Sequence, residues 1–248
     1  MHRFYITPEK WNADALVLAG AEARHAARVL RLKPGARVAA FNGRGREVTA
    51  EIVSIHGDEI RLRKLHEALT PPLRCRIALA QAIPKGKNMD LIVQKAVEIG
   101  AAEIAPLLSD RTVVTVSEEG MVQKQQKWQQ IAIEAAKQCG QNWLPSVHRP
   151  KTVRDFFSAA PDFDLQLIGS LQSDAMHLKT VLADYRREHG DRPASVMMCI
   201  GPEGDFTPAE LNLARARGCI PITLGPIILR VETAAIYCLS ILSYELLT

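Results

Sequence analysis

The sequence predicts an α/β fold with a parallel sheet, preceded by a small β-rich domain. From about residue 73 onward apolar runs alternate with amphipathic helices, and short strands with glycine turns fill residues 1–70. Between the two patterns stands Thr70-Pro71-Pro72, and two successive prolines can continue neither a helix nor a central strand. We therefore expect two domains, at 1–70 and 73–248.

The composition is that of an ordinary folded protein. The chain has 248 residues, 47% of them hydrophobic and 23% charged, so it can bury a sizeable core. No apolar run reaches the roughly 18 residues that span a bilayer, and the opening residues lack the apolar centre of a secretory signal. We expect a cytoplasmic protein with no membrane contact. The five cysteines and seven histidines lack metal-ligand spacing, so we expect reduced, mostly buried thiols and no metal.

The positive charge is concentrated near the N-terminus. Residues 1–70 hold 12 Lys and Arg against 8 Asp and Glu, whereas 19 of each cancel in the remainder, so the net charge of +4 lies in the first domain. A local basic surplus is typical of a module that docks a polyanion such as RNA, although a surplus of four also arises by chance.

The first domain is predicted to be a compact barrel of short strands around one helix. Strands over 36–42 and 46–55 flank Gly43-Arg44-Gly45, which predicts a hairpin. A third strand, over 58–65, would bury Ile60 and Leu62 and expose Arg61 and Arg63, because side chains alternate along a strand. The helix, over 22–32, would carry Arg24, Arg28 and Arg31 on one face, which is either a solvated face or an RNA contact.

The second domain reads as a series of buried strands and covering helices. Strands are expected over 74–82, 102–108, 165–169, 195–200 and 219–224, and helices over 87–100, 127–139, 174–188, 208–217 and 234–247. Continuous apolar strands indicate burial on both faces of a parallel sheet, and ligands of such sheets bind at the carboxyl ends of the strands.

Two glycine-containing loops stand at such strand ends. Gly201-Pro202-Glu203-Gly204 precedes a helix that Thr207-Pro208-Ala209-Glu210 is expected to start with a capping box, so it is either an ordinary turn or a ligand loop. In the second, 225–233, Arg230 and Glu232 lie between two buried elements. Burying both charges is costly unless they bind a ligand, cap the last helix or pair with each other. Neither G-x-G-x-x-G nor a P-loop motif occurs, which disfavours a standard dinucleotide or nucleotide site.

The two loops and the stretches around them resemble a known family. IGPEGDFTPAEL and LGPIILRVETAA look like the paired signature of SPOUT methyltransferases, and their wording resembles the RsmE family, the ribosomal RNA small subunit methyltransferases E. Supporting stretches are MHRFYI, HAARVLRLKPGARVAAFNGRG, QAIPKGKNMDLIVQKAVEIGAAEIAPLLSDRTVV and KWQQIAIEAAKQCGQ, which together cover most of the chain. Ile227 departs from the arginine common at its position, and Asp205 from a glycine.

The resemblance implies a PUA-like RNA-binding barrel at 1–70 and a SPOUT α/β domain at 73–248 with a deep trefoil knot in 200–248. It implies S-adenosylmethionine as the cofactor, a homodimer, and methylation of N3 of one uridine in small-subunit (16S) ribosomal RNA on the assembled 30S subunit. Two readings stay open beside it: methylation of another base or of a ribose 2′-hydroxyl, and a non-catalytic RNA-binding factor of ribosome assembly.

The chemistry of methyl transfer, the basic first domain and the resemblance each suggest site residues. Arg230 would stabilise charge that develops on the base, and Glu232, or a water molecule that it orients, would accept the N3 proton. RNA docking falls to Arg24, Arg28, Arg31, Arg61 and Arg63. The expected cofactor-binding residues are Ile200, Gly201, Pro202, Glu203, Gly204, Leu224, Gly225, Pro226, Leu229 and Arg230.

Overall fold

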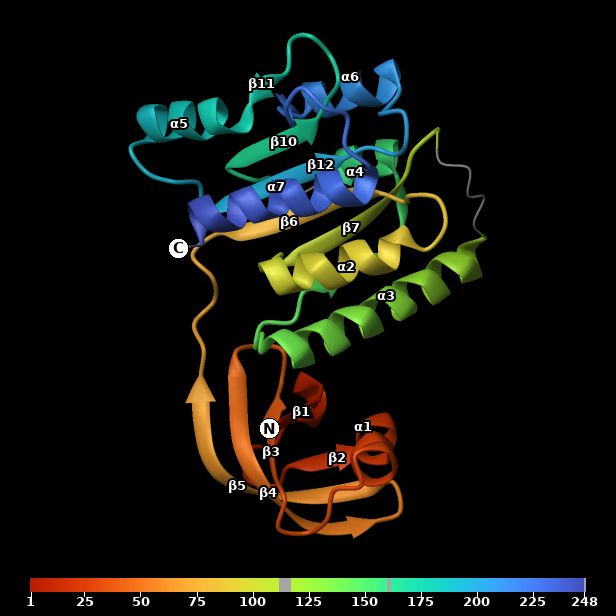
Figure 1. Ribbon diagram of the computed structural model, residues 1–248, viewed down its shortest axis with the longest axis vertical. Helices are drawn as coiled ribbons and strands as arrows, with labels where there is room; N and C mark the ends of the chain where they lie inside the picture. Colours follow the sequence, from red (N-terminus) through yellow and green to blue (C-terminus); the bar gives the residue numbers. More distant parts are fainter. Residues whose placement is uncertain (112–116, 160–161, 248) are drawn as a thin grey trace. The chain divides into compact units, whose positions relative to one another are not determined.

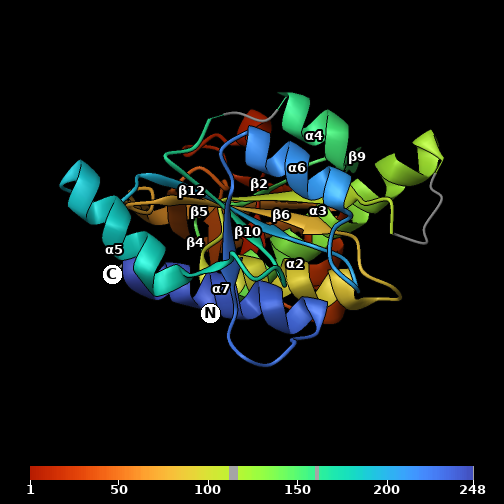
Figure 2. The same ribbon diagram turned by 90° about the horizontal axis from the view of Figure 1, so that it is seen from above.

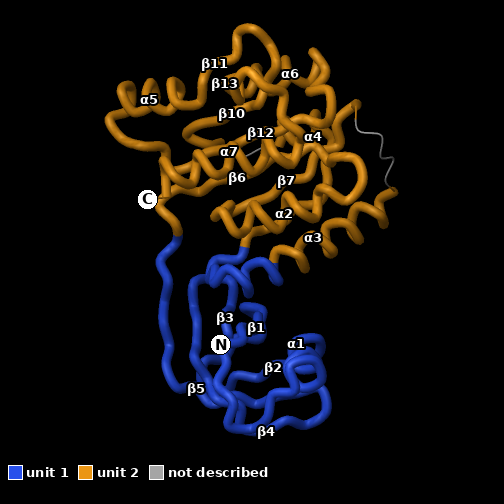
Figure 3. Tube along the Cα trace, viewed as in Figure 1, with its two compact units in different colours: residues 1–72, 133–144 blue, residues 73–132, 145–248 orange. Residues whose placement is uncertain are grey.

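The computed structural model describes residues 1–111, 117–159 and 162–247, which form two compact units. Unit 1 contains Met1–Pro72 and Ile133–Leu144, and unit 2 contains Leu73–Ala132 and Pro145–Thr248 (Figure 3). The first change of unit falls in the proline linker. The return of residues 133–144 to unit 1 differs from the expected assignment of all of 73–248 to one domain, because no change of composition marks these residues.

Unit 1 is built on a five-stranded sheet with the order β1-β3-β4-β5-β2 (Figure 1). Its strands are β1 (His2–Tyr5), β2 (Val17–Ala19), β3 (Arg37–Phe41), β4 (Arg46–His56) and β5 (Glu59–Leu69). Its helical elements are the 3-10 turn η1 (Pro8–Lys10), helix α1 (Gly20–Arg24) and the π-helical turn η2 (His25–Val29). β1 and β3 are parallel, and the other pairs are antiparallel.

The strands of unit 1 confirm the predicted pattern. β3 and β4 form the expected antiparallel hairpin. In β5, Ile60 and Leu62 are buried whereas Arg61 and Arg63 are exposed. Apolar side chains of all five strands gather with those of α1 and η2 into one core, so the helical segment covers the apolar face of the sheet.

The predicted arginine helix is shorter than expected. It ends at Val29, and Arg31 follows in the left-handed conformation with a φ of 53°. Arg24 and Arg28 therefore share the helical segment, but Arg31 does not continue their row. The spacing of the three arginines suggested a helix over 22–32. Spacing alone, however, does not show at which residue a helix ends.

Residues 133–144 are fastened to unit 1 by specific polar contacts. The side chain of Asn142 accepts a hydrogen bond from Arg3 Nη2 (2.7 Å) and donates one to Thr70 Oγ1 (2.9 Å). Trp143 Nε1 donates to the carbonyl oxygen of Thr70 (2.9 Å). A Cβ on Gly45 would lie 2.6 Å from that same oxygen and 2.9 Å from the Trp143 ring, so this close approach requires glycine.

Unit 2 is an α/β unit whose eight-stranded sheet has the order β11-β13-β10-β12-β6-β7-β8, with β9 paired to β7. All of its strand pairs are parallel, as predicted. The strands are β6 (Arg76–Ala82), β7 (Glu103–Leu108), β8 (Ser146–Val147), β9 (Lys151–Thr152), β10 (Leu165–Gly169), β11 (Met176–His177), β12 (Ser195–Ile200) and β13 (Ile220–Thr223). The helices are α2 (Asn88–Ile99), α4 (Val153–Ala159), α5 (Leu178–His189), α6 (Pro208–Ala216) and α7 (Val231–Leu246). α3 (Glu118–Cys139) begins in unit 2, and its last residues belong to unit 1.

Helices cover both faces of the unit 2 sheet, as the continuous apolar strands predicted. α2 and α7 pack on one face, and α4 and α6 lie on the other (Figure 2). Six of the seven residues of β6 and five of the six in β12 are buried. In parallel sheets of this kind, ligands usually bind at the carboxyl ends of the strands. The trefoil knot expected in 200–248 stays a prediction.

Most of the thiols are buried, as expected. Cys75, Cys199, Cys219 and Cys238 are buried and Cys139 is exposed, and none forms a disulfide within the described residues. Burial raises the pKa of Cys75 to about 11 and that of Cys238 to about 12, so both thiols stay protonated at neutral pH.

Candidate active site

A cavity of about 550 Å³ lies at the carboxyl ends of β10, β12 and β13 in unit 2. Three loops line it, at 169–172, 200–205 and 223–230, together with the start of α7. All of the predicted cofactor-binding residues lie on this lining, because parallel strands deliver their following loops to one edge of the sheet. The first loop, Gly169-Ser170-Leu171-Gln172, was missed in the sequence, where it follows a strand without a capping signal or a glycine pair.

The loop after β12 is held by the predicted capping box. Glu210 N donates to Thr207 Oγ1 (3.3 Å), and Thr207 N donates to Glu210 Oε2 (2.8 Å). The Glu210 side chain is only 4% exposed, and it also accepts hydrogen bonds from Ser109 Oγ (3.1 Å) and Asp110 N (2.9 Å). This buried carboxylate therefore joins the end of the loop to the segment after β7.

Asp205 links two of the three loops. Its φ of 69° is left-handed, a conformation that favours glycine, and this accounts for the glycine expected at the position. Its carboxylate accepts hydrogen bonds from Leu171 N (3.2 Å) and Phe206 N (2.7 Å). The aspartate thus adds a tie that a glycine cannot supply.

The loop after β13 presents a free cation. Gly225 has a φ of 111°, and a Cβ there would meet no atom within 4 Å, so the backbone is open to the cavity. Arg230 is the N-cap residue of α7, but its side chain makes no cap hydrogen bond. It is exposed, and its guanidinium has no hydrogen-bond or ion-pair partner among the described residues. The suggested pairing of Arg230 with Glu232, or capping by Arg230, is therefore not seen.

Glu232 lies on the first turn of α7 beside the cavity but does not line it. Its Oε2 accepts a hydrogen bond from Asn88 Nδ2 (3.1 Å), at the start of α2. In the preceding segment, Lys85 N donates to Glu203 Oε1 (3.2 Å). The residues between β6 and the start of α2 therefore donate hydrogen bonds to one carboxylate of each predicted loop. These carboxylates are Glu203 in 201–204 and Glu232 in 225–233. Asn88 was missed in the sequence, although residues 83–88 follow the end of β6, and ligands of parallel sheets bind at such strand ends.

The predicted RNA-binding arginines of unit 1 differ in their partners. Arg24 Nη1 lies 2.7 Å and Arg28 Nη2 3.6 Å from the carboxylate of Asp58, and Arg63 Nη2 lies 3.0 Å from Glu51. Arg31 and Arg61 are exposed without a side-chain partner in the described part of the chain. Of the five predicted arginines, these two are the ones without an ion-pair partner among the described residues.

Within 1–111, 117–159 and 162–247, no three or more His, Cys, Asp or Glu side chains are grouped so that they could hold a metal ion. None of the helices in these ranges combines the length and the apolar character that crossing a membrane requires.

Comparisons with known proteins place both units in one family. Residues 71–243 match the model of the RNA methyltransferase domain, and residues 18–65 match that of the RNA methyltransferase PUA domain. The chain is 33% identical to the ribosomal RNA small subunit methyltransferase E of Synechocystis, over 94% of this chain and 74% of that protein. It is 28% identical to the enzyme of the same name from Bacillus subtilis, over 99% and 97%.

Solved structures agree with the sequence comparisons. The ribosomal RNA small subunit methyltransferase E of Neisseria gonorrhoeae, bound to S-adenosyl methionine, is 30% identical, with a TM-score of 0.85 over 99% of this chain and 98% of that one. The protein Lpg2936 of Legionella pneumophila, solved with the cofactor SAM, is 33% identical, with a TM-score of 0.86 over 98% and 97%. The fold, the paired loops and these matches together show that the chain belongs to the family of ribosomal RNA small subunit methyltransferases E.

Proposed function

We propose that this protein transfers the methyl group of S-adenosylmethionine to N3 of one uridine in the ribosomal RNA of the small subunit, with the assembled subunit as substrate. The observation that carries the proposal is the convergence of three loops on one cavity at the carboxyl edge of the unit 2 sheet. The named relatives act on the RNA of the small subunit, which agrees with this substrate. Because ribosomes are its substrate, we place the protein in the cytoplasm.

The cavity suits S-adenosylmethionine. Its volume of about 550 Å³ falls within the roughly 300–1,000 Å³ typical of small-molecule sites. Gly204 and Gly225 leave backbone groups accessible to a nucleoside, and Leu224 and Leu229 supply apolar surface. When bound, S-adenosylmethionine supplies a methyl group on a positively charged sulfur. Arg230 is the cationic residue of this lining. Because its side chain is exposed to solvent, the positive sulfur of the cofactor would not meet a buried positive charge.

Methylation of uridine N3 requires a group that accepts a proton and a group that stabilises negative charge, and residues at the cavity can supply both. N3 of uracil carries an imide proton that must leave when the N–C bond forms, and the negative charge that develops spreads to the flanking carbonyl oxygens. Arg230 is free to stabilise that charge, since it has no partner of its own among the described residues. Glu232, or a water molecule that it orients, accepts the proton. Asn88 orients this carboxylate through its amide.

Primer extension across small-subunit ribosomal RNA, from cells with and without the gene, tests the proposed reaction. Methylation of uridine N3 blocks base pairing, so reverse transcriptase should stop at one uridine only when the gene is present. Mass spectrometry of the digested RNA identifies the modified atom. A methyl group on another base or on a ribose would contradict the N3 assignment, and calorimetry without heat on addition of S-adenosylmethionine would favour a non-catalytic factor.

Asn88→Ala should lower turnover about tenfold, because it removes the hydrogen bond that orients Glu232, and typical acid-base effects are about 100-fold or more. A double-mutant cycle with Glu232→Gln makes the measurement specific. If Asn88 acts through Glu232, the double variant should be no slower than Glu232→Gln alone. Full additivity of the two losses would contradict the positioning role of Asn88.

The affinity for small-subunit RNA should fall steeply with salt, since unit 1 binds phosphates through its free arginines. Each phosphate contact contributes about 0.7 to 0.9 to the slope of log affinity against log salt. Arg31→Ala and Arg61→Ala should each reduce that slope by roughly this amount. Arg63→Ala is the matched control, because Glu51 already neutralises Arg63, and its slope should change less. A wild-type affinity that does not change with salt would contradict RNA docking by unit 1.

A homodimer is the proposed assembly, and an apolar surface on unit 2 supports it. Tyr237 and Tyr244 lie seven residues apart on one face of α7 and are 45% and 74% exposed, and Leu91 of α2 is 41% exposed. Tyr237→Glu combined with Tyr244→Glu should give monomers by light scattering, because charges would then be buried at the interface. Met176→Glu, at an exposed residue of β11, is the control and should stay dimeric. A wild-type monomer would contradict the assembly.

A further inference from the structure

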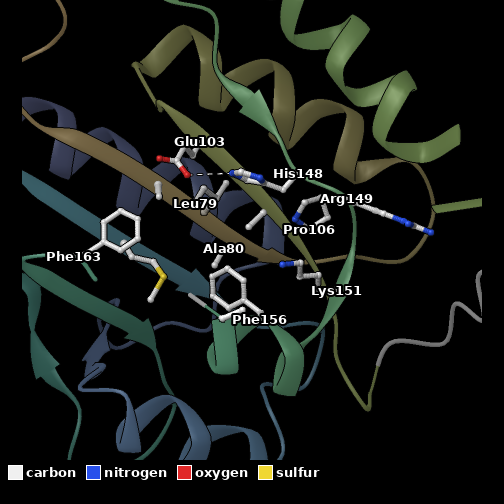
Figure 4. Close-up of a pocket in the computed structure, with 13 residues that line it drawn as sticks. Leu79, Ala80, Glu103, Pro106, His148, Arg149, Lys151, Phe156 and Phe163 are labelled. Atoms are coloured by element: carbon white, nitrogen blue, oxygen red, sulfur yellow. Dashed lines mark hydrogen bonds and ion pairs between the residues drawn. The ribbon is translucent and has the colours of Figure 1, made fainter. Parts of the chain in front are cut away.

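Unit 2 has a second cavity, of about 230 Å³, on the sheet face that α4 and α6 cover (Figure 4). Its floor is made by Ala78 and Ala80 of β6, Ala105 and Pro106 of β7 and Met197 of β12. The cavity shares no lining residue with the proposed cofactor site in the described chain. Small side chains on neighbouring strands create the recess, since alanines leave space that larger residues would fill. Protein interiors contain few voids larger than a water molecule, so a recess of this size is a candidate for a binding site.

Two aromatic rings form part of the cavity wall. Phe156 of α4 and Phe163 are both half-buried, and their rings lie along the same side of the recess (Figure 4). The guanidinium of Arg76 lies over the Phe163 ring at 4.4 Å from its centroid, and Phe157 meets Phe156 edge-on at 5.2 Å. These neighbours hold each ring in place at the cavity wall.

The charges around the cavity leave one cation without a partner. Glu103 accepts hydrogen bonds from Arg76 Nη1 (3.1 Å) and lies 3.1 Å from His148 Nε2. Arg149 pairs with Glu118. Lys151 is exposed and has no hydrogen-bond or ion-pair partner among the described residues, and its amine points toward the space between Pro106 and Phe156 (Figure 4). The cavity therefore suits a flat, largely apolar group that is attached to one negatively charged group, which would lie near Lys151.

We propose that this cavity binds one unpaired nucleotide of the RNA substrate, at a distance from the reacting base. The base would stack against Phe156 or Phe163, and its phosphate would lie near Lys151. Stacking on aromatic side chains beside a cation is the usual recognition of single-stranded RNA. This inference rests on the proposed function, because it takes ribosomal RNA as the substrate.

The size and charge of the site favour a nucleotide within RNA over a free nucleotide. At about 230 Å³ the cavity is smaller than the roughly 300–1,000 Å³ of ordinary small-molecule sites, and it offers a single free lysine. One stack and one ion pair give at most weak binding to a free mononucleotide. When unit 1 and the cofactor site already hold the RNA, the same contacts act at a high effective concentration and add to the affinity.

One strand, β12, contributes lining residues to both cavities. Both lie along β12, where Met197 lines the second cavity and Ile200 lines the proposed cofactor site. Three residues of a strand span about 10 Å. A nucleotide near the target uridine could therefore occupy the second cavity, which would help to select the RNA segment that is methylated.

The test measures binding of the full-length protein to small-subunit ribosomal RNA, and methylation of the assembled subunit, at fixed salt. Phe156→Leu keeps an apolar side chain but removes the ring, and Lys151→Ala removes the free charge. Each should weaken RNA binding roughly 5- to 10-fold and raise KM for the subunit while kcat stays unchanged. Lys179→Ala is the matched control, because Lys179 is an exposed lysine of α5 outside the cavity, and it should stay within twofold.

The affinity for S-adenosylmethionine, measured by calorimetry, should be the same in all three variants and the wild type, which shows that unit 2 stays folded. Equal RNA binding by wild type, Phe156→Leu and Lys151→Ala would overturn this inference alone. A wild-type protein that neither binds nor methylates ribosomal RNA would instead overturn the proposed function. Uridine monophosphate that binds as tightly as the RNA would identify a free-nucleotide site and count against the inference.

Discussion

Arg230→Ala should lower the turnover number for RNA methylation about 100-fold or more, with little change in the affinity for S-adenosylmethionine. The guanidinium of Arg230 lies at the cavity and has no partner in the described chain, so it is available for charge that exists only in the transition state. A group that acts only there changes turnover and not ground-state binding. Removing one such donor typically lowers the rate about 100- to 1,000-fold.

Single-turnover methylation of the assembled subunit measures this loss, and calorimetry with S-adenosylmethionine measures binding separately. Arg230→Lys is the informative control, because it keeps the charge but not the planar fork of donors, and it should recover only part of the rate. Unchanged turnover in Arg230→Ala would exclude the catalytic role. A large loss of cofactor affinity with normal turnover at saturation would make Arg230 a binding residue only.

The sequence was sufficient where local chemistry decides the structure. The capping box at Thr207 and Glu210 was predicted because its residues are three apart, and its hydrogen bonds form as expected. The loops after β12 and β13 were found because each follows a continuous apolar strand, and parallel strands bring such loops to one edge. The alternation in β5 needed only the period of two.

The sequence was insufficient where distant residues decide the structure. Nothing in residues 133–144 indicates that they join unit 1, because the contacts of Asn142 and Trp143 are with Thr70 and Arg3. The hydrogen bond from Asn88 to Glu232 spans 144 positions of the chain. The sequence indicated no ion-pair partner for Arg24 and Arg28. In the structure, the turn between β4 and β5 places the carboxylate of Asp58 beside both. The spacing of residues in the sequence predicts which side chains are neighbours on one helix or strand. It does not predict which side chains of other elements they contact.

Glu210→Ala should destabilise unit 2 by about 3 kcal/mol or more and weaken the binding of S-adenosylmethionine. The carboxylate is 4% exposed and accepts four hydrogen bonds, from Thr207 N, Thr207 Oγ1, Ser109 Oγ and Asp110 N. Loss of an N-terminal cap typically costs about 1 kcal/mol, and each buried donor left without an acceptor adds about 1–3 kcal/mol. Urea unfolding measures the change in the free energy of unfolding.

The position of the Glu210 carboxylate at the end of the loop explains why its loss should weaken cofactor binding. It fixes Thr207, the residue at which the loop lining the cavity ends, so its removal should loosen 201–207 before unit 2 unfolds as a whole. Hydrogen exchange should therefore rise first in 201–217, while the exchange of β6 stays slow. Glu210→Gln keeps the size and one acceptor oxygen, so it should lose less stability and retain more cofactor affinity. If Glu210→Ala unfolds unit 2 uniformly and leaves cofactor affinity intact below the transition, then the capping box stabilises the fold without shaping the site.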